Sequence, residues 1–289
     1  MTRKSAPQHR LTRRQALQAG AGMGAAGGLL ALDSLGVSAS SGSTGAHLEA
    51  RAIQDATPRP GGNLIAAGTG EIRFDPYFNF VPARFVYSQL FGALFDYRGE
   101  DPLIPHPQLA ESWEETETEL VVTLKENIFF QNGRAIVAQD VVDNIARAKD
   151  PDIGHYLFAV LDASVESAEA IDDRTVRIAY KSVHPVKLDD LAALFLIPAE
   201  AMEDVDTAPV GSGPFEFESY DSGDALVVKR FDEYWEPNLP YLDSVTIKII
   251  PDPAARIANL LSGDVDAVDA LASSDVVRLQ DDDRVQIVT

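Results

Sequence analysis

Apolar and polar residues alternate along this chain in short runs, and most of these runs predict a strand or a helix. The clearest helical pattern begins at Ala138, where apolar residues recur at i, i+3, i+4, i+7 and i+8 and charged residues occupy the other side. Two weaker helical patterns cover residues 83–95 and 187–202, the second interrupted by Pro198. These three segments are expected to pack one apolar face against a core.

Strict alternation predicts two β-hairpins. The runs "VESAEAI" and "RTVRIAY" flank a turn at residues 172–173, and "GSGPFEFESY" and "ALVVKRF" flank a turn at residues 221–224. Single strands are expected over residues 63–67 and 119–130. In the second hairpin, Gly211 and Gly213 are expected to supply backbone angles that other residues avoid, so that the chain turns into the strand.

The last part of the chain alternates strands and helices. The pattern predicts strands at residues 244–250, 265–268 and 285–289, separated by helices at residues 254–261 and 274–280. Consecutive strands joined by helices require crossover connections, which place them in a parallel or mixed sheet. We therefore expect an α/β protein.

The first 39 residues have the pattern of an export signal. A head with five basic residues and no acidic residue precedes a short middle rich in Gly and Ala, and small residues come before Ser40. The pair Arg13 and Arg14 resembles the twin-arginine export motif. A disordered basic tail is the alternative. Residues 40–60 lack periodicity and end in Pro and Gly, which predicts a flexible linker.

Composition limits the partners and the chemistry. Without residues 1–39 the chain keeps 19 basic and 44 acidic residues, a net charge of −25. Such a charge disfavours binding to nucleic acid and to anionic lipid. The chain has no cysteine, which excludes disulfides, thiolate metal sites, a cysteine nucleophile and a lipid anchor attached through cysteine.

No catalytic or metal-binding motif is recognisable. Acidic groups such as Asp264, Asp266 and Asp269 lack the spacing of a calcium loop and alternate with apolar residues, as in a half-buried strand. Trp113, Tyr234 and Trp235 are interpreted mainly as packing residues. The histidines are scattered over the sequence: His9, His47, His106, His155 and His184. We expect no enzyme, no cofactor and no metal.

Six segments carry a resemblance to a known family. In chain order they read "GGNLIAAGTGEIRFDP", "PQLAESWEET", "NGRAIVAQDVV", "GSGPFEFESY", "KRFDEYWEPNLPYLDSVTIKIIPD" and "SGDVDAVD". Together they resemble the peptide- and nickel-type solute-binding proteins of ABC importers, the extracellular solute-binding protein family 5, from residue 61 to residue 289. Small departures occur at Asn132, Val137 and Ser212.

The resemblance implies a type II periplasmic-binding-protein fold with a discontinuous first lobe. Residues 61–91 and 210–289 would form that lobe around a mixed sheet, and residues 92–209 a smaller inserted α+β domain. A second lobe would follow residue 289, so we expect the chain to be the N-terminal half of a longer binding protein.

The resemblance also implies a function. The protein would capture a peptide or similar small solute outside the membrane and deliver it to an ABC permease, after export by the twin-arginine translocase to the periplasm or the outer face of the membrane. The ligand would lie against Asn79, Phe80 and Val81, with Phe74 and Tyr77 near by. An alternative for the aromatic residues is packing of the loop. Other functions left open are a cell-surface interaction protein and, less favoured, an acidic extracellular hydrolase.

Overall fold

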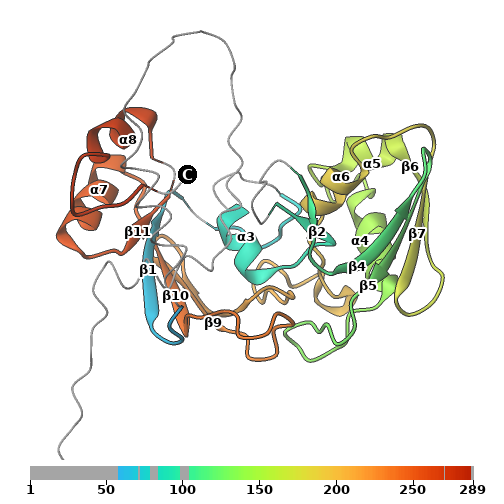
Figure 1. Ribbon diagram of the computed structural model, residues 1–289, viewed down its shortest axis with the longest axis horizontal. Coiled ribbons are helices and arrows are strands. Elements are labelled where there is room, and N and C mark those ends of the chain that lie inside the picture. The colour runs from blue at the N-terminus through green and yellow to red at the C-terminus, as the bar shows by residue number, and fades with distance from the viewer. Residues whose placement is uncertain (1–57, 71, 79–83, 98–103, 270, 288–289) are drawn as a thin grey trace, which may run out of the picture.

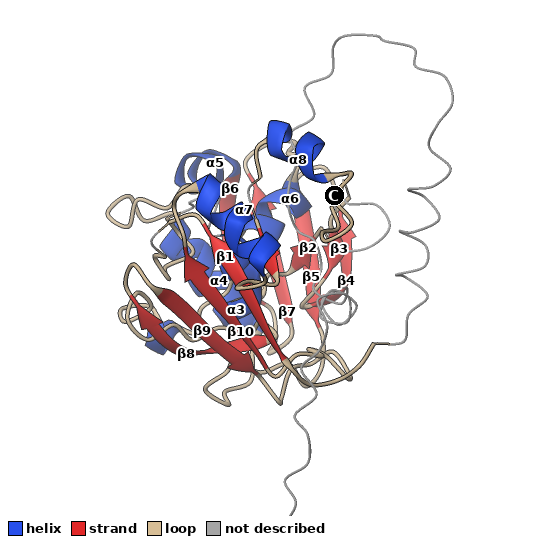
Figure 2. Ribbon diagram, turned by 90° about the vertical axis from the view of Figure 1, so that its left-hand side faces the viewer, coloured by secondary structure: helices blue, strands red, loops and turns tan. Residues whose placement is uncertain are grey.

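The computed structural model describes residues 58–70, 72–78, 84–97, 104–269 and 271–287 (Figure 1). Two sheets lie at opposite ends of this part of the chain, and a short helix lies between them (Figure 1). Figure 2 shows the same elements from the side, with helices covering the sheets. No helix of the described residues is long and apolar enough to cross a membrane.

The first sheet has five strands and joins distant parts of the sequence. Its order is β11 (Ala267–Val268), β1 (Asn63–Gly68), β10 (Ser244–Ile249), β9 (Ala225–Arg230) and β8 (Phe215–Asp221). Strand β1 is parallel to both of its neighbours, β10 and β11. Strand β9 is antiparallel to both of its neighbours, β10 and β8. The predicted mixed sheet is therefore confirmed.

The second sheet has four antiparallel strands. They follow the order β4 (Ala110–Glu115), β5 (Glu119–Leu124), β7 (Thr175–Tyr180) and β6 (Val165–Ala170). The β6–β7 hairpin forms where the alternation predicted it. At its turn the Asp172 carboxylate accepts the backbone N–H groups of residues 174 and 175, both at 2.8 Å, in the manner of an Asx turn.

Helix α4 (Ala138–Ala148) packs against β6 and β7, as its apolar pattern predicted. The Asp140 carboxylate accepts the Val137 N–H at 2.9 Å and so stabilises the start of the helix. Two short elements, α5 (Phe158–Ser164) and α6 (Lys187–Ala193), lie near this sheet (Figure 1).

The two other predicted helices are shorter than expected. Helix α3 (Arg84–Leu90) and helix α6 stop early, and both are followed by fully or nearly fully buried apolar residues. Residues 91–95 and 194–197 are buried on all sides, so their apolar run reflects core burial rather than one face of a helix. They are not helical, and an isolated bridge pairs Ala93 with Phe195. Two small elements complete the region: the ribbon β2 (Phe95–Asp96) with β3 (His106–Pro107), and a 3₁₀ turn η2 (Ala199–Ala201).

The prediction that Gly211 and Gly213 adopt backbone angles closed to other residues is wrong. Neither has a positive φ; instead, a side chain would collide with the end of α3. A Cβ atom on Gly211 would lie 2.1 Å from the Leu90 carbonyl oxygen, and one on Gly213 would lie 2.3 Å from the Gln89 carbonyl oxygen. The two glycines are therefore required by close backbone approach, the other use of a missing side chain.

One glutamine holds this close approach together. The side-chain amide of Gln131 donates to the carbonyl groups of Leu90 at 2.9 Å and Phe215 at 2.8 Å. Its oxygen accepts the Gly211 N–H at 2.9 Å. The end of α3, the glycine segment and β8 are thus joined through a single side chain.

In the C-terminal region, the described residues form two helices after β10. Helix α7 (Pro253–Ser262) begins with Asp252 accepting the Ala255 N–H at 2.7 Å, and ends at Gly263, whose φ is 89°. Helix α8 (Ser273–Leu279) follows. The strand predicted over residues 285–289 is absent from the described residues 285–287. The reason is local: the Val285 N–H donates within a turn to the Asp282 carbonyl at 3.1 Å, so it is not available for a strand pair.

Residues of both sheets belong to one continuous apolar core. Leu226 and Val245 represent the five-stranded sheet, and Leu120 and Ile178 represent the four-stranded sheet; all four are fully buried. The two sheets are therefore held together by hydrophobic burial.

Candidate functional site

The parallel strands of the first sheet end at a common edge. Strands β1, β10 and β11 run in the same direction and finish at Gly68, Ile249 and Val268. In open α/β sheets, ligands bind outside the carboxyl ends of parallel strands. We call this set of strand ends, with the residues that directly follow them, the carboxyl edge.

The chain leaves β1 at the carboxyl edge and enters a firmly held segment, residues 72–78. Phe74 is 2% exposed and meets the rings of Phe217 and Tyr220 edge-on, with centroids 5.3 and 5.2 Å away. Both partners lie on β8, so this contact fixes the start of the segment to the five-stranded sheet.

Tyr77 fixes the same segment to the other part of the molecule. It is fully buried, its hydroxyl donates to the side-chain oxygen of Asn144 on α4, and its ring meets that of His155 with centroids 4.2 Å apart. Burial raises the pKa of the Tyr77 hydroxyl well above its usual value, so it stays a protonated donor.

A largely buried ion pair lies beside Tyr77. Arg147 on α4 donates to both oxygens of Asp75, at 2.8 and 3.3 Å, and its guanidinium carbon lies 4.2 Å from the centre of the Tyr77 ring. Asp75 also accepts the Tyr77 N–H at 3.0 Å, and its own N–H donates to Asp206 at 2.9 Å. The two charges are thus compensated in a bidentate geometry.

His155 completes this cluster. The residue is 3% exposed, and its Nδ1 accepts the Leu157 N–H at 2.8 Å. Burial, aided by the positive charge of Arg147, lowers its pKa to about 3. The ring is therefore neutral at physiological pH, and because Nδ1 accepts, its proton lies on Nε2.

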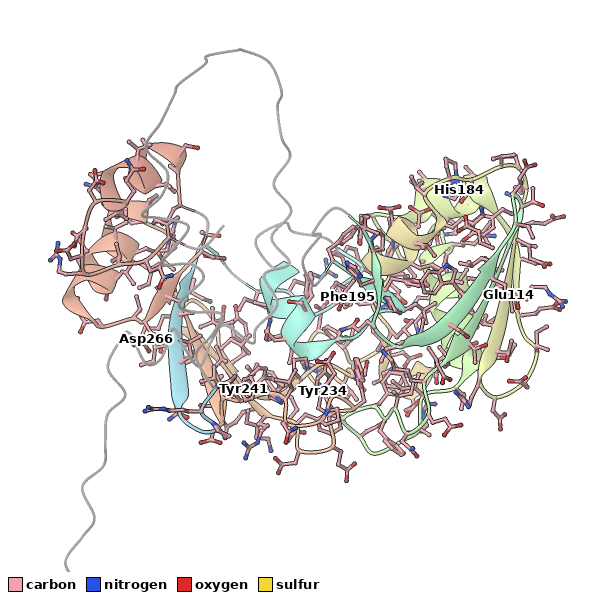
Figure 3. The ribbon with its side chains drawn as sticks, viewed as in Figure 1. Glu114, His184, Phe195, Tyr234, Tyr241 and Asp266 are labelled. Atoms are coloured by element: carbon pink, nitrogen blue, oxygen red, sulfur yellow. The ribbon has the colours of Figure 1, made fainter. Side chains whose placement is uncertain are left out.

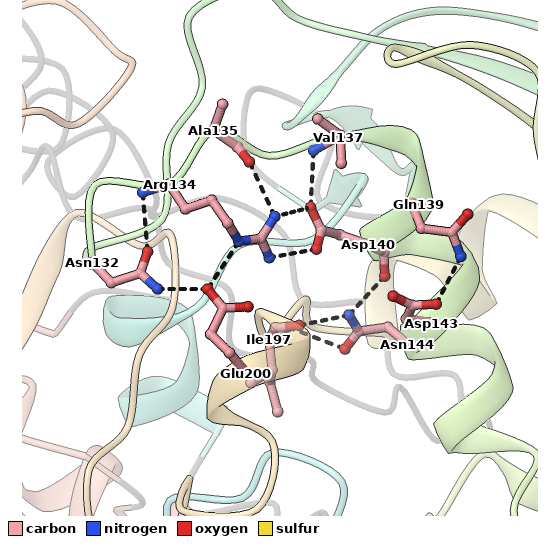
Figure 4. A network of polar contacts seen from close by, with 10 residues as sticks. All are labelled: Asn132, Arg134, Ala135, Val137, Gln139, Asp140, Asp143, Asn144, Ile197 and Glu200. Carbon is pink, nitrogen blue, oxygen red and sulfur yellow. Dashed lines mark hydrogen bonds and ion pairs between the residues drawn. The ribbon is translucent and has the colours of Figure 1, made fainter.

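A second polar cluster surrounds the "NGR" motif at the start of α4 (Figure 4). Arg134 forms a bidentate pair with Asp140, at 2.6 and 3.0 Å, and donates from Nε to Glu200 at 2.9 Å. Asn132 joins the cluster by donating to Glu200 at 2.8 Å. These hydrogen bonds give the cluster a role in joining the motif to the 3₁₀ turn.

The acidic groups near β11 differ from one another in their contacts. Asp266, labelled in Figure 3, accepts the Ile65 N–H at 3.0 Å and thereby joins β11 to β1. Asp269 directly follows β11, is only partly exposed, and has one carboxylate oxygen that is buried. Among the described residues, no group of three or more histidine or acidic side chains is placed to hold a metal ion.

Not all residues predicted to form the site can be placed. Phe74 and Tyr77 are buried and packed as described above, whereas Asn79, Phe80 and Val81 lie outside the described residues. Arg13 and Arg14 of the predicted export signal also lie outside them. Ligand contact by the five loop residues stays a prediction.

Arg256, which the sequence patterns did not single out, lies beside the carboxyl edge. It lies in the first turns of α7, is 3% exposed, and donates from Nη1 to the carbonyl groups of Ile250 and Pro251, both at 2.9 Å. A signal was present in the sequence: an arginine in a mostly apolar helix run, "AARIANLL".

Comparisons with known proteins agree with this architecture. The glutathione-binding protein GsiB of Escherichia coli (strain K12) is 33% identical over 210 residues, which cover 70% of this chain and 40% of GsiB. The chain thus spans less than half the length of the curated relatives it matches.

Two solved structures are similar in fold. The binding protein AgaA from A. tumefaciens R10, in complex with agropinic acid, is 27% identical with a TM-score of 0.70, covering 76% of this chain and 46% of AgaA. The oligopeptide-binding protein AppA from Bacillus subtilis, in complex with a nonapeptide, is 26% identical with a TM-score of 0.67, covering 72% of this chain and 44% of AppA.

The model of the bacterial extracellular solute-binding proteins, family 5 (middle region), matches residues 105–289, which include the whole four-stranded sheet and four strands of the five-stranded sheet. The chain belongs to this family.

Proposed function

We propose that this chain acts as the solute-binding component of an ABC importer and captures a peptide or a similarly small solute outside the membrane. Family membership supports the binding role. The ligands named for its relatives are glutathione for GsiB, a nonapeptide for AppA and agropinic acid for AgaA.

The observation that carries the proposal is the carboxyl edge with its held segment. Three parallel strands end side by side, and residues 72–78 are fixed both to β8 and to α4 before the chain reaches Asn79. A loop held at its start can present main-chain groups to a ligand with little loss of entropy on binding. We propose that residues 79–81 pair with an extended ligand in this way, and that Phe74 and Tyr77 support them.

The proposal extends to domains and partners. Residues 61–91 and 210–289 would form the lobe that carries the carboxyl edge, and residues 92–209 the inserted domain. The binding protein would deliver the captured solute to an ABC permease in the membrane. Arg13 and Arg14 would direct its export through the twin-arginine translocase. Because the sequence has no cysteine, retention at the membrane would not use a cysteine-linked lipid.

Binding by the purified protein tests the proposal directly. The full-length protein, rather than this chain alone, is titrated with trialanine, glutathione and the nickel–histidine complex in a calorimeter, and its melting temperature is followed in parallel. Saturable one-to-one binding of at least one probe, with a rise in melting temperature, is expected because a ligand that binds only the folded state stabilises it. Absence of saturable binding to the whole panel would overturn the proposal.

A further inference from the structure

Two complementary charged groups lie at the carboxyl edge without forming an ion pair. Arg256 is held by the carbonyl groups of Ile250 and Pro251, the two residues that directly follow β10. Asp269 directly follows β11, and its N–H is 3.4 Å from the Ala67 carbonyl oxygen of β1. The two side chains are therefore fixed at neighbouring strand ends.

Each of these side chains has a buried polar atom without a partner among the described residues. In Arg256 it is Nε, a donor, and in Asp269 it is Oδ1, an acceptor. Such atoms are rare in folded proteins, because desolvating a polar group without a compensating hydrogen bond is unfavourable. Burial raises the pKa of Asp269, and the positive charge of Arg256 lowers it by a smaller amount.

The neighbouring backbone leaves room on the same edge. Gly70 lies two residues beyond the end of β1, and a Cβ atom on it would meet no atom of the described residues within 4 Å. This contrasts with Gly211 and Gly213, where a Cβ atom would collide with backbone. The carboxyl edge thus combines a buried donor and a buried acceptor with an exposed glycine just after β1.

We propose that Arg256 and Asp269 form a subsite for one peptide group of the ligand, in which Arg256 Nε–H donates to the ligand carbonyl and Asp269 Oδ1 accepts the ligand N–H. A peptide group is neutral and carries one donor and one acceptor, so it matches a pair of opposite charges better than an ammonium or a carboxylate does. The inference rests on the proposed binding function and specifies the ligand as an amide-containing molecule.

Asp266 provides a contrast from the same short stretch of chain. Its carboxylate is occupied by the Ile65 N–H and joins two strands, so it has a structural task. Asp269 has no such bond on Oδ1. Removing the two carboxylates should therefore have opposite effects on stability.

The test compares Asp269→Leu with Asp266→Leu, since leucine has nearly the shape of aspartate but no polar atom. Asp269→Leu is expected to leave the melting temperature of the free protein unchanged or raise it, because an uncompensated buried acceptor is removed. Asp266→Leu is expected to lower it by several degrees. A drop for Asp269→Leu as large as that for Asp266→Leu would assign Asp269 a structural role and overturn the proposal.

Binding is tested with trialanine and two analogues, each N-methylated at one of its two amide nitrogens. One methylation should weaken binding to the original protein at least tenfold, and the same methylation should have little further effect on Asp269→Leu, since the lost N–H no longer has its acceptor. Equal losses in both proteins for both analogues would overturn the subsite.

The test separates failure of the subsite from failure of the proposed function. If trialanine binds and the methylation losses are equal, the binding function stands and the subsite is wrong. If neither trialanine nor glutathione binds, both the peptide function and the subsite are wrong.

Arg256→Lys tests the other half of the subsite, because lysine lacks the Nε–H donor but keeps the charge. This variant should bind trialanine more weakly, and the loss caused by N-methylation should stay within twofold of that in the original protein.

Discussion

Two arginine–aspartate pairs in this protein have the same chemistry and different surroundings. Arg147 and Asp75 form a bidentate ion pair in which the carboxylate also accepts a backbone N–H. Arg256 and Asp269 lie at the carboxyl edge, and each retains a buried atom without a partner among the described residues. The first pair joins two parts of the fold, whereas the second retains one unsatisfied donor and one unsatisfied acceptor.

The difference separates a fully compensated charged pair from a pair in which one atom of each side chain is not compensated. Compensated buried charges stabilise one arrangement of the chain and are costly to break. Uncompensated buried groups cost stability in the free protein, and proteins accept that cost at functional sites. The four predictions below test whether the region around Arg147 is structural and whether the carboxyl edge is not.

The largest effect is expected from breaking the compensated pair. Arg147→Met leaves Asp75 buried without its cation, and we expect the free energy of unfolding to fall by about 3–5 kcal/mol in urea denaturation. The control is Arg177→Met, because Arg177 is 44% exposed in its ion pairs with Glu119 and Glu169. The control should lose less than about 1 kcal/mol. Similar losses in both variants would contradict the structural role of Arg147.

A pair of glycine substitutions tests the same contrast through the backbone. Gly213→Ala places a methyl group against the Gln89 carbonyl, and overpacking of this kind is expected to cost about 3 kcal/mol. Gly70→Ala meets open space and should change stability by less than about 1 kcal/mol, in the stabilising direction. Thermal unfolding of both variants measures the difference, and a marked loss for Gly70→Ala would show that the carboxyl edge is more crowded than described.

The pH dependence of stability reports on the cluster around Tyr77. The pKa of His155 is about 3 in the folded protein and about 6.5 in the unfolded chain. The unfolded chain therefore binds the proton first, and stability should fall as the pH drops from about 6.5 towards 3.

Replacing His155 by phenylalanine should remove this part of the pH dependence. Between pH 7.5 and 5, the loss of stability should be smaller in the variant by about 2 kcal/mol. Urea denaturation of both proteins at pH 7.5, 6 and 5 gives the comparison. The variant also loses the hydrogen bond from the Leu157 N–H at every pH, so each stability is compared with that of the same protein at pH 7.5. Parallel curves for the two proteins would show that His155 takes up a proton as readily in the folded protein as in the unfolded chain, and would contradict its lowered pKa.

The smallest effect is expected at the predicted ligand contact. Val81→Pro removes one N–H donor, and loss of one hydrogen bond to the ligand should weaken trialanine binding by about 1 kcal/mol, or roughly fivefold to tenfold. Val81→Ala keeps the donor and is the matched control. Circular dichroism must show that both variants are folded, and unchanged affinity of the proline variant would assign residue 81 to packing.

Much of the fold could be predicted from local pattern. Helix α4 and the hairpins β6–β7 and β8–β9 formed where periodicity placed them, because each has one buried and one exposed face. The pattern failed where burial is complete on all sides. Residues 91–95 and 194–197 are apolar throughout, and such a run has no periodicity that separates helix from extended chain.

The carboxyl edge was harder to predict than the fold. The resemblance drew attention to Asn79, Phe80 and Val81, but nothing in the sequence spacing brings Arg256 close to Asp269. Their neighbourhood depends on β1 lying between β10 and β11, which is a property of the sheet order. The same holds for Gly211 and Gly213, whose partners on α3 are more than a hundred residues away in sequence.

The position of β1 in the sheet has a consequence for how the chain folds during synthesis. β1 is the first strand of the sheet to be made, yet it pairs on both sides with strands made much later; Asn63 and Ser244, for example, are 181 residues apart. At typical ribosomal rates this separation corresponds to a wait of roughly 10–40 s. The hairpins can close early, whereas the centre of the five-stranded sheet must close late, as expected for pairing of high contact order. The carboxyl edge therefore comes into existence only in the last stage of folding.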